Sequence, residues 1–303
     1  MRIEREGIKD NVNQIVIKPV MSLNNFIGKH PVFIYFILTF VISWSGVFIR
    51  AFSTGMPASA DVSAKIGPIA YLPFLLGPII TSFLLTILIE GREGLRKLIN
   101  SMVKYRTGIR WYAVGLLTLP ILASTTLLIL SQFSNDFIPD IITGDNKVRI
   151  ILTGIIVGII GGGVMEETGW TGFAIYRLRS RYGIFTTGLI VGIVWGGWHF
   201  LPVFWGCGDG NGNLDMSLFL PGFFFHFAGL IPFRILIVWV YERTRSVFLA
   251  ILMHSTLTGG LFFILNISVK GKSLFKYYLA LAVLLWILVA LIINVNRKKG
   301  ELS

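Results

Sequence analysis

Apolar residues in this chain fall into eight long runs that are separated by short polar segments. Each run approaches or exceeds the roughly 20 residues that a helix needs to cross a hydrocarbon core about 30 Å thick. We therefore predict eight transmembrane helices, at residues 31–50, 66–90, 111–131, 149–172, 183–205, 217–241, 246–268 and 277–296. The fourth run has an irregular pattern, and so does the sixth, which contains Pro221, Pro232 and Arg234.

The loops between these runs are short, which predicts one transmembrane domain at 31–296 with tails at 1–30 and 297–303. The expected fold class is therefore all-α, a polytopic helical bundle in the membrane. The first thirty residues lack the short apolar core of a cleavable signal peptide, so we expect the first helix to be an uncleaved insertion signal. No internal repeat is visible in the sequence, which counts against the inverted-repeat transporters.

Composition supports a membrane protein, because 54% of residues are hydrophobic and only 14% are charged, against about 25% charged in soluble proteins. The net charge of +12 follows from topology: 19 basic residues lie on one side of the eight-helix arrangement and 6 on the other. This bias predicts a multi-pass protein of the cell membrane with both termini in the cytoplasm. The basic loops are too short to form a nucleic-acid-binding face, so no nucleic-acid partner is expected.

Few ionisable residues lie within the predicted helices. Besides Arg50 and Glu90 at helix ends, they are Glu166, Glu167, His199, His226, Arg234 and His254. A charged residue at the centre of a membrane helix costs at least ~2.5–3.5 kcal/mol and usually faces a cavity. Three of the four histidines are in this group, which predicts a functional site inside the bilayer. The single cysteine, Cys207, excludes an intrachain disulfide and is expected to be a passive thiol.

Glu166 and Glu167 are adjacent, so on a helix their directions differ by about 100° and they cannot both face one point. One interpretation places both at the cytoplasmic interface, paired with Arg177 or Arg179. The other makes one acid a general base in a cavity while its neighbour anchors another helix. The preceding glycines at 161–163 allow close helix packing under either interpretation.

The histidines differ in their surroundings. His199 follows Trp195, two glycines and another tryptophan, and small residues beside large ones are typical of a cavity wall. His254 precedes a polar run that includes Thr258, whereas His226 has aromatic neighbours and is expected to be a packing residue. The sequence contains no HExxH or GxSxG motif. The loop at 209–215 lacks the glycine and glutamate of a calcium site and is predicted to be a turn.

The segments EETGWTGFAIYRL, WGGWH and LAILMHSTLT resemble the CAAX prenyl endopeptidase and bacteriocin-immunity (Abi, or CPBP) family of intramembrane proteases. That family carries EExxxR, then an aromatic residue four positions before a histidine, then a histidine four positions before Asn or Asp. The matching positions span about 150–260 and are Glu166, Glu167, Thr171, Trp195, His199, His254 and Thr258.

Two of these positions depart from the family pattern. Thr171 replaces the arginine, and Thr258 replaces Asn or Asp. The Thr258 hydroxyl can still donate a hydrogen bond, but Thr171 cannot replace a guanidinium. If that arginine pairs with the second glutamate, Glu167 needs another partner here, and Arg177 is our candidate.

The resemblance implies an intramembrane endopeptidase that cleaves a membrane-associated protein or peptide, prenylated or not, with an activated water. Glu166 is then the general base, which a low-dielectric cavity would strengthen. His199 and His254 would orient the water and stabilise the oxyanion with help from Thr258, and Glu167 would tie helices together.

Three alternatives stay open from the sequence. One glutamate with two histidines is also a possible zinc set, although the resemblance favours a metal-free site. The departures at Thr171 and Thr258 motivate a catalytically weak immunity or scaffold protein of the same fold. Eight helices with buried charge would also suit a small-molecule transporter. The sequence specifies neither the substrate nor the oligomeric state.

Overall fold

The computed structural model describes residues 23–59, 62 and 71–298 and is almost entirely helical there, with no β-strand in those ranges. The predicted all-α membrane bundle is therefore confirmed. Among the described residues, eight helical stretches are long and apolar enough to cross a membrane: Pro31–Thr54, Leu72–Met102, Ile109–Ser131, Lys147–Leu178, Ile184–Gly206, Met216–Thr244, Val247–Ile264 and Gly271–Asn296. Of the predicted tails, residues 1–22 and 299–303 lie outside the described residues, and the sidedness of the termini stays a prediction.

Several of these stretches contain more than one helical element. The α-helices are α1 (Leu23–Lys29), α2 (Pro31–Thr54), α4 (Leu72–Met102), α5 (Ile109–Ser131), α6 (Asp140–Thr143), α7 (Lys147–Val157), α8 (Glu167–Gly169), α9 (Tyr176–Leu178), α10 (Ile184–Trp198), α11 (Phe200–Gly206), α12 (Met216–Ala228), α13 (Leu230–Thr244), α14 (Val247–Ser255) and α15 (Gly271–Lys298). The other helical elements in the described ranges are a 3₁₀ turn, η2 (Asn135–Phe137), and three π-helical segments, η3 (Gly158–Glu166), η4 (Trp170–Ile175) and η5 (Thr256–Ile264).

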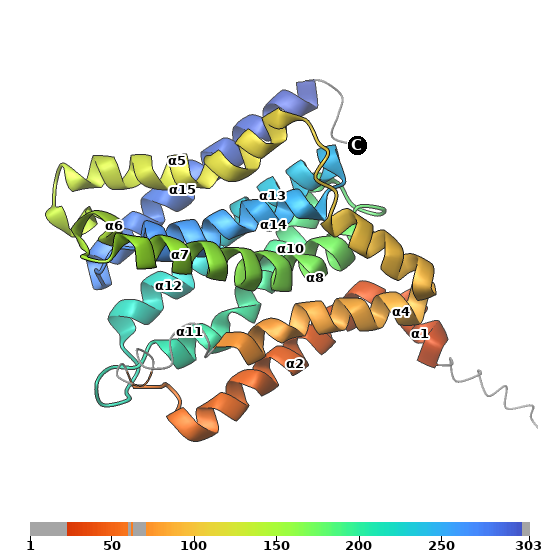
Figure 1. Ribbon diagram of the computed structural model, residues 1–303, viewed down its shortest axis with the longest axis horizontal. Helices are drawn as coiled ribbons and strands as arrows, with labels where there is room; N and C mark the ends of the chain where they lie inside the picture. Colours follow the sequence, from red (N-terminus) through yellow and green to blue (C-terminus); the bar gives the residue numbers. More distant parts are fainter. Residues whose placement is uncertain (1–22, 60–61, 63–70, 299–303) are drawn as a thin grey trace, which may run out of the picture.

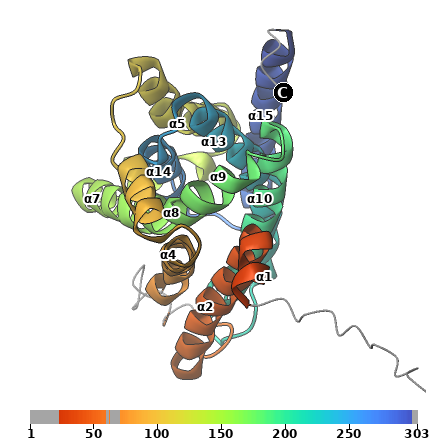
Figure 2. The same ribbon diagram turned by 90° about the vertical axis from the view of Figure 1, so that its right-hand side faces the viewer.

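The helices pack around a buried central pair. Helices α2 and α4 run along one side of the bundle and α5 and α15 along the opposite side (Figure 1). Seen from the end of the bundle, α13 and α14 lie between α5, α7, α8 and α10 (Figure 2). Almost every residue of α13 is buried, and its apolar residues are distributed around the whole helix, as expected for a helix enclosed by others.

Glycines bring α10 against α13. Gly188 faces Ile235 so closely that a side chain there would collide with the opposite helix, and Gly192 faces Ile231 with little space to spare. Small residues at such crossings let membrane helices approach and gain van der Waals contact. The result is that Arg234, beside these contacts on α13, has no exposed surface.

The helices are irregular at the two predicted stretches and at three others in the described ranges. Lys147–Leu178 contains the π-helical η3 and η4, and Met216–Thr244 is interrupted at Gly229. The unpredicted irregularities are η5, an interruption at His199 between α10 and α11, and a kink in α4. Glu166 ends η3 and His254 lies just before η5. π-Helical turns are frequent at functional sites, and here they surround the residues that the motifs singled out.

Helix α4 is longer than the sequence pattern predicted. We placed a loop from residue 91, but the helix continues to Met102 after a kink at Gly91, which has φ 63° and ψ −154°. The apolar run ends near this kink. Beyond the hydrocarbon core, however, a helix is stable when a single apolar stripe packs against the protein and its other face is polar. Gly94 and Leu98 provide that buried stripe, so the basic residues from Arg92 to Lys97 are helical.

The loop at 209–215 is a turn, as predicted. The Asp209 carboxylate accepts hydrogen bonds from the backbone N–H groups of Asn211 and Asn213, both at 2.8 Å. Burial raises the pKa of the Cys207 thiol to about 11, and the nearby Asp215 carboxylate contributes. A thiol with such a pKa stays protonated at neutral pH, which agrees with a passive free cysteine.

Candidate active site

A cavity of about 410 Å³ inside the bundle brings together the predicted site residues Glu166, His199, His254 and Thr258. The side chains come from η3, α14 and η5 and from the interruption after α10. The rest of the wall is mostly apolar and aromatic, as is usual for small-molecule and peptide sites. Glu167 is not among the lining residues, so the two adjacent acids separate as the 100° argument predicted.

Glu166 is held by one oxygen and presents the other to the cavity. Trp195 Nε1, on α10, donates a hydrogen bond to Glu166 Oε2 at 2.7 Å. The second oxygen, Oε1, lies 3.9 Å from His254 Nε2. This separation is too long for a direct hydrogen bond but short enough for one water to contact both atoms. The carboxylate is only 4% exposed, although it lines the cavity.

Glu167 is fully buried and has polar partners on both oxygens. Arg234 Nη1 donates to Oε1 at 2.7 Å and to Oε2 at 2.9 Å. The Thr171 hydroxyl donates to Oε2, and His254 Nδ1 lies 2.6 Å from Oε1. Buried charges require this kind of pairing, and here it connects η4, α13 and α14 to Glu167.

Arg177 is not the partner of Glu167, so that expectation is wrong. Arg177 lies ten residues farther along the same helical stretch, about 15 Å at helical rise, and it pairs with Glu90 on α4. Arg179 pairs with Glu242 at 2.7 Å. The interpretation that places both acids at the interface, paired with Arg177 or Arg179, is also wrong, because both glutamates are buried inside the bundle.

Arg234 connects the two glutamates through Trp195. Its guanidinium carbon lies 3.9 Å from the centre of the Trp195 ring, and the same indole donates to Glu166. The sequence showed Arg234 as an intramembrane charge but gave it no role, because its partner Glu167 is 67 positions away. Two features of the sequence together could have identified Arg234 as the partner of Glu167. Position 171 lacks the family's arginine, and the sixth apolar run contains Arg234 with no acidic residue close to it in sequence.

His254 lies between the two glutamates. Its Nδ1 faces the Glu167 carboxylate, which can only accept a hydrogen bond when ionised, so Nδ1 is assigned as the protonated nitrogen. A neutral ring then directs the lone pair of Nε2 toward Glu166, since the bond at one nitrogen sets the state of the other. His254 thus links the anchored acid to the acid in the cavity.

His199 and His226 form a second pair in the cavity wall, with ring centres 4.8 Å apart. Each Nδ1 bonds a carbonyl four residues back, of Trp195 at 2.8 Å and of Gly222 at 2.6 Å. We expected His226 to be a packing residue, but it lines the cavity. Its aromatic neighbours in sequence do not reveal that α12 faces the end of α10, so only the number of intramembrane histidines pointed to it.

The zinc set that the sequence left open is not drawn together among the described residues. Within the described ranges, no three His, Cys, Asp or Glu side chains are grouped closely enough to hold a metal ion. We therefore derive no catalytic step through a metal.

Comparison with known proteins agrees with this geometry. A family model described as Type II CAAX prenyl endopeptidase Rce1-like matches residues 148–259, which include the acids and histidines of the cavity. The protein named CAAX prenyl protease 2 from Methanococcus maripaludis is 23% identical over 226 residues, which cover 73% of this chain and 80% of that protein. These matches confirm the resemblance to the CAAX prenyl endopeptidase and bacteriocin-immunity family.

Proposed function

We propose that this chain is a CAAX-type intramembrane endopeptidase that hydrolyses a peptide bond of a membrane-associated protein or peptide. The observation that carries the proposal is the pair formed by Glu166 Oε1 and His254 Nε2, 3.9 Å apart in a cavity within the bundle. The Rce1-like match and the name of the archaeal relative support it. A prenylated C-terminal tail is the first substrate class to test, because that name refers to a prenyl protease.

The reaction begins with a water between Glu166 and His254. Glu166 Oε1 takes a proton from this water while the water oxygen attacks the carbonyl carbon of the scissile peptide. The proton then passes from Glu166 to the peptide nitrogen, the C–N bond breaks, and the products are a carboxylic acid and an amine. The bond from Trp195 to Oε2 keeps the other oxygen directed at the water.

Charge that develops on the peptide oxygen needs donors on the cavity wall. The Thr258 hydroxyl lines the cavity, and none of the described residues hydrogen-bonds to it, so it is available to donate. The Nδ1 of His199 is bonded to the Trp195 carbonyl, so in a neutral ring Nε2 is an acceptor that can orient the attacking water. Thr258 thus keeps its expected role as a donor to the peptide oxygen, and His199 keeps the expected role of orienting the water.

The Glu167–Arg234 pair acts as the support of His254. Thr171 contributes a hydrogen bond and Arg234 contributes the positive charge that position 171 lacks. The absent motif arginine was the main reason to consider a catalytically weak scaffold protein. With a guanidinium on Glu167 from α13, that reason loses most of its weight.

Terminal-peptide proteomics tests the proposal and can name a substrate. Cells with the native protein are compared with cells that carry Glu166→Gln, and Glu93→Gln serves as control because Glu93 is an exposed acid on α4. We expect new peptide termini with the native and Glu93→Gln proteins that are missing with Glu166→Gln. Identical sets of termini would favour the scaffold alternative, and substrate-dependent flux in liposomes would favour a transporter.

Trp195→Phe tests the positioning of Glu166. Phenylalanine keeps an aromatic ring beneath Arg234 but removes the N–H that donates to Glu166 Oε2. A hydrogen bond to a charged group is worth about 1.5–3 kcal/mol, so we expect kcat to fall about 10–100-fold with KM little changed. The measurement is steady-state hydrolysis by the purified protein.

Trp286→Phe is the matched control for this change. Trp286 also donates its indole N–H, to the carbonyl of Ala228 at 3.0 Å, but it lies on α15 and does not line the cavity. We expect kcat to stay near the native value. Equal losses in the two variants, or none in Trp195→Phe, would contradict a positioning role for Trp195.

A further inference from the structure

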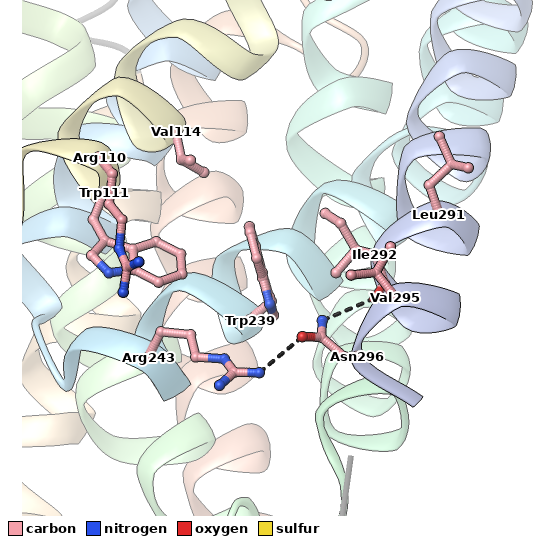
Figure 3. A pocket seen from close by; sticks show the side chains of 9 residues that line it. All are labelled: Arg110, Trp111, Val114, Trp239, Arg243, Leu291, Ile292, Val295 and Asn296. Carbon is pink, nitrogen blue, oxygen red and sulfur yellow. Dashed lines mark hydrogen bonds between the residues drawn. The ribbon is translucent and has the colours of Figure 1, made fainter. Parts of the chain in front are cut away.

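A second hollow, separate from the cavity, lies between α5, α13 and α15 and has a volume of about 430 Å³ (Figure 3). Arg110 and Trp111 face it from the start of α5, and Trp239 and Arg243 face it from the last turns of α13. We call it the α5–α15 groove. Both charged residues of its lining are arginines, Arg110 and Arg243, and all its lining residues lie within the described part of the chain.

The polar end of the groove suits an anion. Arg110 lies in the first turn of α5, where the helix dipole adds partial positive charge. Arg243 Nη2 donates to Asn296 Oδ1 at 2.9 Å, and this bond orients the guanidinium beside α15 (Figure 3). Guanidinium groups match the geometry of phosphate oxygens and form bidentate bonds with them.

The rest of the groove suits the membrane. The Trp111 and Trp239 rings pack edge to face with centres 5.1 Å apart, and tryptophan favours the border between headgroups and acyl chains. Beyond them, α15 contributes Leu291, Ile292 and Val295. The indole N–H of Trp239 has no hydrogen-bond acceptor among the described residues, and buried donors usually have one.

We propose that the α5–α15 groove binds an anionic glycerophospholipid. The phosphate lies near Arg110 and Arg243, and an acyl chain follows the apolar side of α15 past the two tryptophans. A lipid fits better than free phosphate, because the groove continues from the arginines into an apolar wall on a membrane-spanning helix. Basic hollows between transmembrane helices are ordinary sites for anionic headgroups.

This lipid would act on the helix that carries Arg234. Arg243 and Arg234 are nine residues apart on α13, about 13 Å at helical rise, and α13 is the buried centre of the bundle. A ligand that joins the end of α13 to α5 and α15 holds three helices in register. The lipid is therefore expected to stabilise the fold, whether or not the proposed protease activity holds.

The test uses the full chain in nanodiscs of phosphatidylcholine alone or with added phosphatidylglycerol. We expect the anionic lipid to raise Tm and to appear as a bound species in native mass spectrometry. Arg110→Gln should weaken binding of phosphatidylglycerol about tenfold, since it removes one of the two proposed phosphate contacts. The variant should still fold, because Arg110 is exposed. Arg106→Gln is the control, because Arg106 is an exposed arginine of the preceding loop outside the groove.

Three results would overturn the proposal. The first is an equal phosphatidylglycerol response in Arg110→Gln and the native protein. The second is an equal loss in Arg106→Gln, which would mean general attraction between the basic surface and the bilayer. The third is an equal rise in Tm on adding inorganic phosphate to phosphatidylcholine nanodiscs, which would make the groove an anion site without lipid preference.

Discussion

Glu166→Gln is expected to abolish peptide hydrolysis while the protein folds normally. Glutamine has nearly the same size, and its amide oxygen can still accept the hydrogen bond from Trp195 that Glu166 Oε2 accepts now. It cannot take a proton from water at neutral pH, and general bases contribute about 10²–10⁴-fold to rates. We therefore expect kcat to fall about 10²–10⁴-fold, measured with prenylated and unprenylated peptides in proteoliposomes.

Folding of this variant is checked by Tm and by size-exclusion elution. The loss of function then has a chemical cause only if both stay near the native values. Glu93→Gln, the same substitution at an exposed position of α4, should keep full activity. Substantial hydrolysis by the folded Glu166→Gln protein would exclude Glu166 as the base and would move attention to His254, the other group beside the water position.

The eight helices were predictable because the bilayer imposes a length on every crossing segment. Apolar runs of that length are local in sequence, and each predicted run overlaps one of the helical stretches. The boundary of α4 was not predictable in the same way, since its last part from Arg92 to Met102 is helical without being apolar throughout. The number of apolar residues needed to cross the bilayer predicts the part of a helix inside the hydrocarbon core, but it does not predict how far the helix continues outside it.

The separation of Glu166 and Glu167 was also predictable, because it depends only on the angle between adjacent helical positions. That His254 reaches both acids was not. The ring contacts Glu167 through Nδ1 and approaches Glu166 through Nε2, which depends on how α14 packs against η3. Gly162 and Gly163 allow this approach, because side chains there would collide with α14 and η5, yet glycines alone do not specify which helix they contact.

The partner of Glu167 could not be found from sequence because it lies on another helix. A search along the same helix led to Arg177, which is too far away to reach. Thr171 and Arg234 both contact Glu167, so the departure from the family pattern and its compensation meet at one carboxylate. Neither motif spacing nor hydropathy relates positions 171 and 234; only packing does.

Arg234→Met is expected to have the largest effect on stability. The change leaves Glu167 fully buried without a cation, and breaking a buried ion pair on one side costs about 3–5 kcal/mol. It should also abolish hydrolysis, because Arg234 packs on Trp195 and shares Glu167 with His254. The measurements are the free energy of unfolding in detergent and the rate of peptide hydrolysis.

A double-mutant cycle with Glu167→Gln separates the ion pair from the bulk of the side chain. The double variant has no unpaired buried charge, so its loss should be smaller than the sum of the single losses by about 2–3 kcal/mol, within the range for groups in direct contact. Additive losses would mean that Arg234 does not pair with Glu167 in the folded protein. Activity should stay low, because a glutamine in place of Glu167 is a weaker acceptor for His254 Nδ1 and no longer fixes the ring with Nε2 directed at Glu166.

An exchange of the two positions tests whether Arg234 supplies what Thr171 lacks. Thr171→Arg with Arg234→Thr moves the guanidinium to the family's motif position and keeps the total side-chain volume. From position 171 an arginine follows Glu167 by four residues, a favourable helical ion-pair spacing, and the threonine there already contacts the carboxylate. We expect the exchange to be more stable and more active than Arg234→Thr alone. If the exchange variant is no more stable and no more active than Arg234→Thr, the fold requires the positive charge to be on α13, and a charge at position 171 cannot replace it.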